Sequence, residues 1–251
     1  CREEGFLNPE KLPANASGLE PDSIPRHVAM IMDGNGRWAA RRGLSRVFGH
    51  VEGHKTVRRI TNLAGHLGVH YLTLYAFSVE NWRRPAEEVS ALMELIEHVA
   101  HEEIPSLCQE NVRFNIIGRL QDLPEPLRLE LERDMELTRD NTGLTLTLAV
   151  NYGGRSEIVD AVRRLVADGV TPEQVDEQAI SSRLYTADIP DPDLLIRTAG
   201  ELRVSNYLLW QIAYTEIYVT DTLWPDLSEK DFVYALLAYQ KRTRKFGGLV
   251  S

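Results

Sequence analysis

The chain contains little cysteine and no long apolar run. Cys1 and Cys108 are its two cysteines, so neither a disulfide framework nor a thiolate metal cluster is expected, which fits a reducing compartment. No apolar stretch approaches the roughly 20 residues that span a bilayer, and no secretory signal pattern is recognised. The net charge of -9 argues against a general binder of nucleic acid or anionic membranes. We expect a cytoplasmic protein.

Short apolar runs alternate with amphipathic patterns along the chain. The expected strands cover 27–33, 71–77, 112–117, 144–150, 194–196 and 217–220. Helical patterns cover 37–42, 50–67, 86–108, 124–140, 154–168, 173–184, 206–214 and 228–245. This order predicts an α/β fold with right-handed crossovers and a mainly parallel central sheet of about six strands, flanked by helices. We expect a single catalytic domain over 25–251 after a flexible N-terminal arm over 1–24, which is polar and aperiodic.

The first expected strand leads directly into a candidate metal and phosphate site. Its apolar run stops at Asp33, and Gly34 and Gly36 then bracket Asn35 before a helical stretch opens with Arg37. Ligands of parallel sheets bind beyond the carboxyl ends of strands, where the next helix presents free N–H groups. A carboxylate at that place suits a divalent cation, and the glycines let the backbone approach an anion closely.

Two other interpretations of this segment remain open. Residues 37–59 carry seven basic side chains and one acidic side chain, which is also the pattern of a solvated helix face. Gly34, Gly36 and Ala39 satisfy the dinucleotide pattern G-x-G-x-x-G/A, which would indicate an oxidoreductase. That pattern is weak here, because Trp38 is bulky. The next strand also ends near Phe77, 43 residues past Gly34, whereas the pattern needs an acid at a strand end about 20 residues on.

The second expected strand is followed by a polar segment at residues 78–85. Ser78, Asn81 and Arg84 can hydrogen-bond phosphate oxygens, and Trp82 offers an apolar wall. An ordinary polar loop before a helix explains the same residues equally well.

A third candidate segment begins where the strand at 194–196 ends. Arg197 and Arg203 could hold a diphosphate, and Ser205 or Asn206 would cap a helix over 206–214. Glu216 opens the next strand and could give a metal a second oxygen. Capping explains Ser205 without any function, but it does not explain Arg197.

Other patterns favour packing over chemistry. His50 and His54, and likewise His66 and His70, have the i,i+4 spacing of zinc ligands, but no third ligand is evident in the sequence. The helix expected near 86–104 has one apolar face, which indicates a core helix unless the substrate is long and apolar.

Taken in this order, the segments resemble the cis-prenyltransferase family, which includes bacterial undecaprenyl diphosphate synthases. The resemblance covers about residues 24–248, and its matching segments are 27–53, 71–95, 141–155, 193–225 and 244–248. It is supported by the absence of the Asp-Asp-x-x-Asp motif of all-helical prenyl synthases. The resemblance implies a Mg²⁺-dependent transferase and homodimer with a hydrophobic tunnel for the growing chain.

The resemblance also implies roles for individual residues. Asp33 would be the magnesium ligand and catalytic carboxylate, Asn81 the proton acceptor, and Glu216 a second metal ligand. The positions implied to bind substrate are Gly34, Asn35, Gly36, Arg37, Trp38, Arg46, His50, Ser78, Val79, Glu80, Trp82, Arg84, Arg197, Arg203, Val204 and Ser205. Leu202 stands where some relatives carry a histidine near the metal, and Ala199 where others carry Gly or Ser.

The implied reaction condenses isopentenyl diphosphate with an allylic diphosphate of the farnesyl type, forming a cis double bond in each round. The product would be a polyprenyl diphosphate, the precursor of the lipid carrier for cell-wall synthesis, with a peripheral membrane contact during product release. A non-catalytic scaffold subunit of the same fold is the alternative, and such a subunit should lack the acid and the arginines named above.

Overall fold

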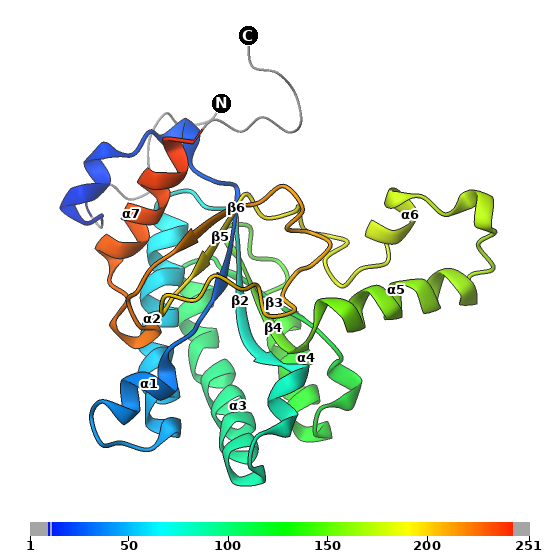
Figure 1. Ribbon diagram of the computed structural model, residues 1–251, viewed down its shortest axis with the longest axis horizontal. Coiled ribbons are helices and arrows are strands. Elements are labelled where there is room, and N and C mark those ends of the chain that lie inside the picture. Colours follow the sequence, from blue (N-terminus) through cyan, green and yellow to red (C-terminus); the bar gives the residue numbers. More distant parts are fainter. Residues whose placement is uncertain (1–9, 11, 243–251) are drawn as a thin grey trace. The chain divides into compact units, whose positions relative to one another are not determined.

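The computed structural model describes residue 10 and residues 12–242 (Figure 1). Its strands are β1 (His27–Ile31), β2 (Tyr71–Ser78), β3 (Arg113–Ile117), β4 (Thr145–Tyr152), β5 (Leu194–Arg197) and β6 (Glu216–Val219). Its α-helices are α1 (Asn35–Ala40), α2 (Arg46–His66), α3 (Ala86–Gln109), α4 (Glu125–Leu137), α5 (Gly154–Ala167), α6 (Glu177–Ser181) and α7 (Glu229–Gln240).

The six strands form one sheet in the order β3-β4-β2-β1-β5-β6. The pairs β1 with β5, β5 with β6, and β3 with β4 are parallel. These findings confirm the predicted α/β class and the six-stranded sheet. Two compact units are distinguished within the chain, one of residues 1–72, 192–202 and 214–251, the other of residues 73–191 and 203–213.

In the first unit, β1 and β5 are buried along their whole length. A strand that is covered on both faces does not alternate between apolar and polar residues. The sequences of β1 and β5 are therefore mostly continuous apolar runs. Their register pairs Ile31 with Arg197, so the segments that follow the two strands leave the sheet at the same edge. The carboxyl edge predicted to bind ligands therefore carries both Asp33 and Arg197 within this unit.

The N-terminal segment has local structure in its described part. Two 3₁₀ helices, Ala14–Gly18 and Pro21–Ser23, flank the buried side chain of Leu19. The Glu20 backbone exchanges two hydrogen bonds with the side chain of Gln240 at the end of α7. The boundary of a flexible arm at residue 24 stays a prediction, and residues 1–9 and 11 lie outside the described part.

Two helix predictions are wrong. In the range 173–184 the only α-helix is the short α6, which begins after Asp176, whose side chain accepts from the Ala179 N–H at 2.7 Å. Residues 206–214 form turns instead of a helix. Asn206 and Leu208 have φ angles of 59° and 44°, and this left-handed conformation interrupts a right-handed helix.

The last predicted helix ends earlier than expected, at Gln240, and the part of the prediction beyond residue 242 lies outside the described residues, as does the matching segment 244–248. Within the described chain, no helix combines the length and the apolar character that a membrane crossing requires.

Candidate active site

The backbone of Asp33 is fixed just beyond β1 by a buried hydroxyl group. The Asp33 N–H donates to Thr198 Oγ1 at 2.9 Å, and the Thr198 hydroxyl donates to the Asp33 carbonyl at 2.7 Å. The same carbonyl accepts from the Trp224 N–H at 3.0 Å. Thr198 follows the end of β5 and is completely buried. The backbone of Asp33 is therefore held by Thr198, which follows β5, and by Trp224, which lies after β6.

The carboxylate of Asp33 lies between two arginines. Arg197 donates to Oδ2 at 2.9 Å, and the Arg37 guanidinium lies 3.6 Å from Oδ1. Arg197 is only 4% exposed, whereas Arg37 is an exposed side chain that also lies 3.8 Å from Glu201. Burial alone would raise the pKa of Asp33, but the hydrogen bond and charge of Arg197, with the charge of Arg37, outweigh it and lower the pKa. Asp33 is thus an ionised carboxylate at neutral pH.

Glycines let α1 and α2 come into close contact beside Asp33. A Cβ on Gly53 would lie 2.4 Å from Asn35 Oδ1, and a Cβ on Gly49 would lie 2.0 Å from the Asn35 carbonyl. Gly34 has a φ of 105° and sits against Leu223, so a side chain there would be strained. The Asn35 side chain donates to the Met32 carbonyl at 3.1 Å, while its buried Oδ1 has no hydrogen-bond partner in the described structure.

Arg46 and His50 lie in the first turns of α2 and belong to the same region. The Arg46 guanidinium lies over Gly36, because a Cβ built there would be 3.0 Å from Arg46 Cζ. Arg46 is exposed and His50 is half-buried. Trp38 donates to Asp226 Oδ1 at 2.7 Å, and Arg42 stacks over its ring at 4.0 Å. The structure thus brings Asp33–Trp38, Arg46 and Arg197 together in the first unit.

In the second unit, the segment after β2 forms a 3₁₀ helix, Val79–Arg83. Ser78 and Asn81 cap it reciprocally, and the Ser78 N–H donates to Asn81 Oδ1 at 3.1 Å. Trp82 donates to Asn151 Oδ1 at 2.7 Å and meets Phe77 edge to face. Ser78 and Asn81 therefore have a structural role as caps of this 3₁₀ helix, which does not depend on any role in substrate binding.

The turn after Arg203 is held against this 3₁₀ helix by Asn206. Its side chain donates to Glu80 Oε1 at 2.8 Å and accepts from the Arg155 N–H at 2.9 Å. Gly153 makes the approach feasible, because a Cβ there would lie 2.8 Å from both Asn206 and Val79. Arg203 and Ser205 are exposed, Val204 is half-buried, and Ser205 has a φ of 48°.

Tyr75 contacts the same turn through a hydrogen bond and a stacked ring. Its hydroxyl donates to the Ser205 carbonyl at 3.3 Å, and its ring stacks on the buried Tyr207 at 4.4 Å. Burial, together with the negative charge of Glu80, raises the pKa of Tyr75, so its hydroxyl keeps its proton and remains a donor. Arg84 pairs with Glu88 at 3.1 Å one helical turn later.

The structure does not bring Glu216 to Asp33. Glu216 begins β6 and pairs in register with Leu194, which in turn pairs with Val28. Asp33 is five residues beyond Val28, or roughly 16 Å along the strand direction. Glu216 is also bound to Arg242 at 2.6 Å. Within one chain Glu216 therefore lies at the sheet edge opposite to Asp33, because the first residue of a parallel strand lies opposite to residues that follow strands. The role of Glu216 as a second metal ligand stays a prediction.

Sequence reasoning missed Thr198, Trp224 and the positioning role of Asn206. Trp224 is buried, and besides its contact with Asp33 it donates from Nε1 to the Gly53 carbonyl at 2.9 Å. Thr198 directly follows Arg197 at the end of β5, and this place beside a strand end could have identified it as a site residue from the sequence. Trp224 is distant in sequence from every motif, and no local pattern identifies it.

The geometry defines an α/β protein with a carboxylate and clustered arginines beyond the carboxyl end of its first strand, as suits a phosphorylated ligand with a cation. The family model described as "Putative undecaprenyl diphosphate synthase" matches residues 31–247. The chain therefore belongs to the undecaprenyl diphosphate synthase family of prenyltransferases.

Individual relatives agree with this assignment. An isoprenyl transferase of Heliobacterium mobile is 54% identical over 92% of this chain and 90% of that protein. A second, from Fusobacterium nucleatum, is 52% identical over 90% of this chain and 97% of that protein.

Two solved structures share the fold. Lavandulyl diphosphate synthase from Lavandula x intermedia, in complex with dimethylallyl diphosphate, matches with a TM-score of 0.87 and 39% identity over 90% of this chain and 99% of that chain. A probable undecaprenyl diphosphate synthase from Campylobacter jejuni matches with a TM-score of 0.76 and 31% identity over 89% of this chain and 98% of that chain.

Proposed function

We propose that this prenyltransferase is a Mg²⁺-dependent enzyme that elongates an allylic diphosphate of the farnesyl type with isopentenyl diphosphate, forming a cis double bond in each round. The observation that carries the proposal is the ionised Asp33 carboxylate between Arg197 and Arg37. A non-catalytic scaffold would have no need of a carboxylate held between two arginines at this edge of the sheet.

The residues around Asp33 fit a magnesium ion. Mg²⁺ prefers oxygen ligands and is commonly held by one or two carboxylates together with substrate phosphates. Asp33 supplies one carboxylate, and its lowered pKa keeps it in the ionised form that a hard cation requires. Within one chain Glu216 is too far along the sheet to help, so diphosphate oxygens and water would supply further ligands. When bound, the ion neutralises charge on the leaving diphosphate.

The arginines of the first unit would bind the allylic diphosphate. Arg37 and Arg46 are exposed at α1 and at the start of α2, and the buried Arg197 donates to Asp33 at 2.9 Å. Guanidinium groups bind phosphate oxygens in a bidentate manner and stabilise the charge that develops as the allylic C–O bond breaks. Arg203 and Ser205 of the second unit would bind the diphosphate of isopentenyl diphosphate.

The reaction forms one carbon–carbon bond and releases one diphosphate and one proton. Asn81 is a poor candidate to accept that proton, because an amide is hardly basic and its Oδ1 already accepts from the Ser78 N–H. We assign Asn81 a positioning role on the 3₁₀ helix and assign the proton to a diphosphate oxygen.

Incorporation of radiolabelled isopentenyl diphosphate with farnesyl diphosphate and Mg²⁺ tests the proposal. Asp33→Ala should lower turnover at least about 100-fold, the order of effect of removing one preorganised electrostatic group. Asp22→Ala, which removes an exposed acid from the same unit, should change nothing. Turnover close to that of the unaltered protein in Asp33→Ala would disprove the role of this carboxylate.

Arg203→Ala separates the two substrate sites. It should raise the KM for isopentenyl diphosphate more than the KM for the allylic substrate, because the assignment places only the former on Arg203. Arg139→Ala, at an exposed arginine after α4, is the matched control. A larger rise for the allylic substrate would contradict the assignment.

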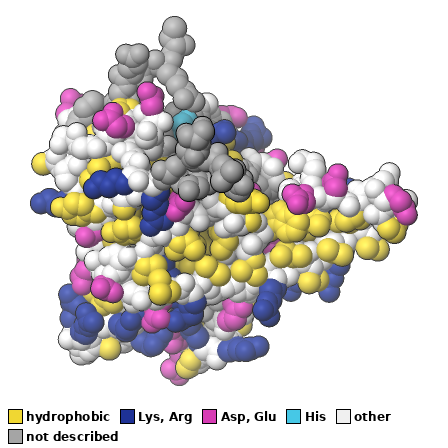
Figure 2. Space-filling model, turned by 45° about the horizontal axis from the view of Figure 1, so that its top comes forward, with side chains coloured by type: hydrophobic (Ala, Val, Ile, Leu, Met, Phe, Trp, Pro, Cys, Tyr) yellow, Lys and Arg dark blue, Asp and Glu magenta, His cyan; other side chains and the backbone are white. Residues whose placement is uncertain are grey.

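We also propose that the chain forms a homodimer through α5. The buried face of α5 carries Glu157, Ala161 and Leu165, whereas Val162 and Val166 are 45% and 74% exposed. Figure 2 shows hydrophobic side chains gathered along the segment that carries α5 in Figure 1. Exposed apolar patches of this kind mark protein interfaces. Sedimentation of Val162→Asp should show monomers where the unaltered chain sediments as a dimer.

A further inference from the structure

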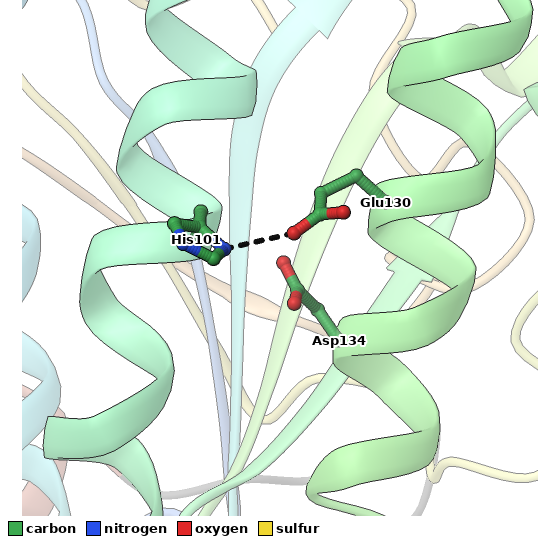
Figure 3. A group of neighbouring side chains, drawn as sticks. All are labelled: His101, Glu130 and Asp134. Atoms are coloured by element: carbon green, nitrogen blue, oxygen red, sulfur yellow. Dashed lines mark hydrogen bonds and ion pairs between the residues drawn. The ribbon is translucent and has the colours of Figure 1, made fainter.

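Three side chains of metal-ligand type meet between α3 and α4 in the second unit (Figure 3). His101 comes from α3, and Glu130 and Asp134 come from successive turns of α4. One ligand atom of each lies within 4.8 Å of the others, and His101 Nδ1 is 2.8 Å from Glu130 Oε1. Figure 3 shows all three side chains pointing toward one another from the facing helices.

One oxygen of the Asp134 carboxyl group has no hydrogen-bond partner among the described residues in this position. Asp134 is 1% exposed, and its buried Oδ2 has no hydrogen-bond partner in the described structure. A buried carboxyl group with an unpartnered oxygen is destabilising unless it is hydrogen-bonded or coordinates a metal ion.

We propose that His101, Glu130 and Asp134 form a binding site for a divalent transition-metal cation of the Zn²⁺ type. One imidazole nitrogen and two carboxylate oxygens are a known ligand class for Zn²⁺, with water completing the tetrahedron. The mixed nitrogen and oxygen set favours such a cation over Mg²⁺ or Ca²⁺, which take oxygen ligands.

The site is open to solvent on one side and closed on the other. The side chain of His101 is 66% exposed and that of Glu130 is 23% exposed, so an ion can enter past them to the buried Asp134. Binding requires the His101–Glu130 hydrogen bond to open from 2.8 Å to about 3.3 Å, the separation that zinc–ligand bonds of about 2.0–2.1 Å give in a tetrahedron.

One neighbouring cation competes for the same carboxylates. Arg133 Nη1 lies 3.6 Å from Glu130 Oε2, but its side chain is 63% exposed and free to turn away. It reaches Glu130 from the solvent side and does not satisfy Asp134 Oδ2. A dication between the helices would compensate the buried Asp134 carboxyl group and join α3 to α4.

A second histidine–carboxylate pair on α3 provides a matched control. His98 Nε2 lies 3.3 Å from Glu102 Oε1, and the two side chains are 67% and 57% exposed. No buried carboxylate joins this pair among the donor groups found in the described residues. It therefore repeats the chemistry of His101 and Glu130 without the third ligand.

Calorimetric titration of the chelator-treated full chain with Zn²⁺ tests the site. His101→Gln and Asp134→Asn should each weaken Zn²⁺ binding at least 10-fold, since even outer-sphere changes cost about 10- to 100-fold. His98→Gln should bind as the unaltered chain does. Zn²⁺ should also raise the Tm of the unaltered chain and of His98→Gln, with that rise lost in the two ligand variants.

The proposal is overturned if Zn²⁺ affinity is the same in His101→Gln as in the unaltered chain. His101 is mostly exposed, so its replacement leaves the fold intact and decides the matter even where Asp134→Asn does not fold. The proposal is also overturned if His98→Gln loses as much Zn²⁺ affinity as His101→Gln, because binding would then be shared among exposed histidines.

Discussion

Replacement of Arg197 by methionine should destabilise the protein and raise the pKa of Asp33. Methionine keeps an unbranched apolar stem in the buried site and removes only the guanidinium that donates to Asp33 at 2.9 Å. The pKa should rise because burial, which disfavours the carboxylate, would then be opposed mainly by Arg37 at 3.6 Å. Diphosphate binding should weaken as well, since a cation is lost.

The magnitude can be worked from the geometry of the pair. At 2.9 Å and an effective dielectric constant of about 20, the gross attraction between unit charges is about 6 kcal/mol. Desolvation offsets much of it, because the Arg197 side chain is only 5% exposed. Breaking a buried pair costs about 3–5 kcal/mol, and the 29% exposure of the Asp33 side chain favours the lower end.

A double-mutant cycle isolates the interaction. Arg197→Met, Asp33→Asn and the double variant should be compared with the unaltered chain by urea unfolding followed through intrinsic fluorescence. We expect the double variant to lose about 1–3 kcal/mol less than the sum of the single losses, as for residues in direct contact. Additivity within about 0.5 kcal/mol would refute the ion pair as a stabilising element of the site.

Two further predictions concern packing and pH. Gly53→Ala should cost about 1–3 kcal/mol, because its Cβ would lie 2.4 Å from Asn35 Oδ1, whereas Gly18→Ala, with an ordinary contact of 3.4 Å, should be nearly neutral in the same unfolding assay. Burial raises the pKa of Glu157 despite the hydroxyl of Tyr152, so above about pH 4.3 the native state binds more protons than the unfolded state at this group. The contribution of Glu157 to the free energy of unfolding should therefore fall as the pH rises. The free energy of unfolding of the unaltered chain, minus that of Glu157→Gln, should fall in the same way, and a difference that is constant with pH would contradict this.

The strands were predictable because burial leaves a simple sequence signal. β1 and β5 are covered on both faces and read as unbroken apolar runs, so periodicity found them. Parallel neighbours end at one edge, and the structure accordingly places Asp33 and Arg197, which follow and end the parallel neighbours β1 and β5, beside each other.

The turn at 206–214 was not predictable from local sequence. Its apolar side chains fit a helical pattern, but Tyr207 stacks on Tyr75 and donates to the Thr73 carbonyl at 3.0 Å, contacts that are remote in sequence. The Asn206 backbone takes a left-handed φ of 59° while its side chain bonds Glu80. Tertiary hydrogen bonds here outweigh the local propensity for a helix.

Register decides which carboxylates can share an ion, and sequence alone does not give register. Glu216 and Asp33 both lie at ends of expected strands, yet Glu216 is the first residue of β6 whereas Asp33 lies two residues beyond the end of β1. The converse holds for His101, Glu130 and Asp134: none belongs to a recognised motif, and only the packing of α3 against α4 brings them together.

The charges around Asp33 bear on how a cation and a diphosphate would bind. Arg197 and Arg37 lie beside Asp33, Glu201 lies beside Arg37, and Arg46 lies over Gly36, so three guanidinium groups accompany two carboxylates and the cluster has a net charge of about +1. A dication added alone would raise this to about +3 next to the largely buried Arg197, where charge is screened poorly. A prenyl diphosphate with up to three negative charges, arriving with the cation, offsets that excess. The arrangement of charges therefore favours joint binding of metal and substrate over a resident ion.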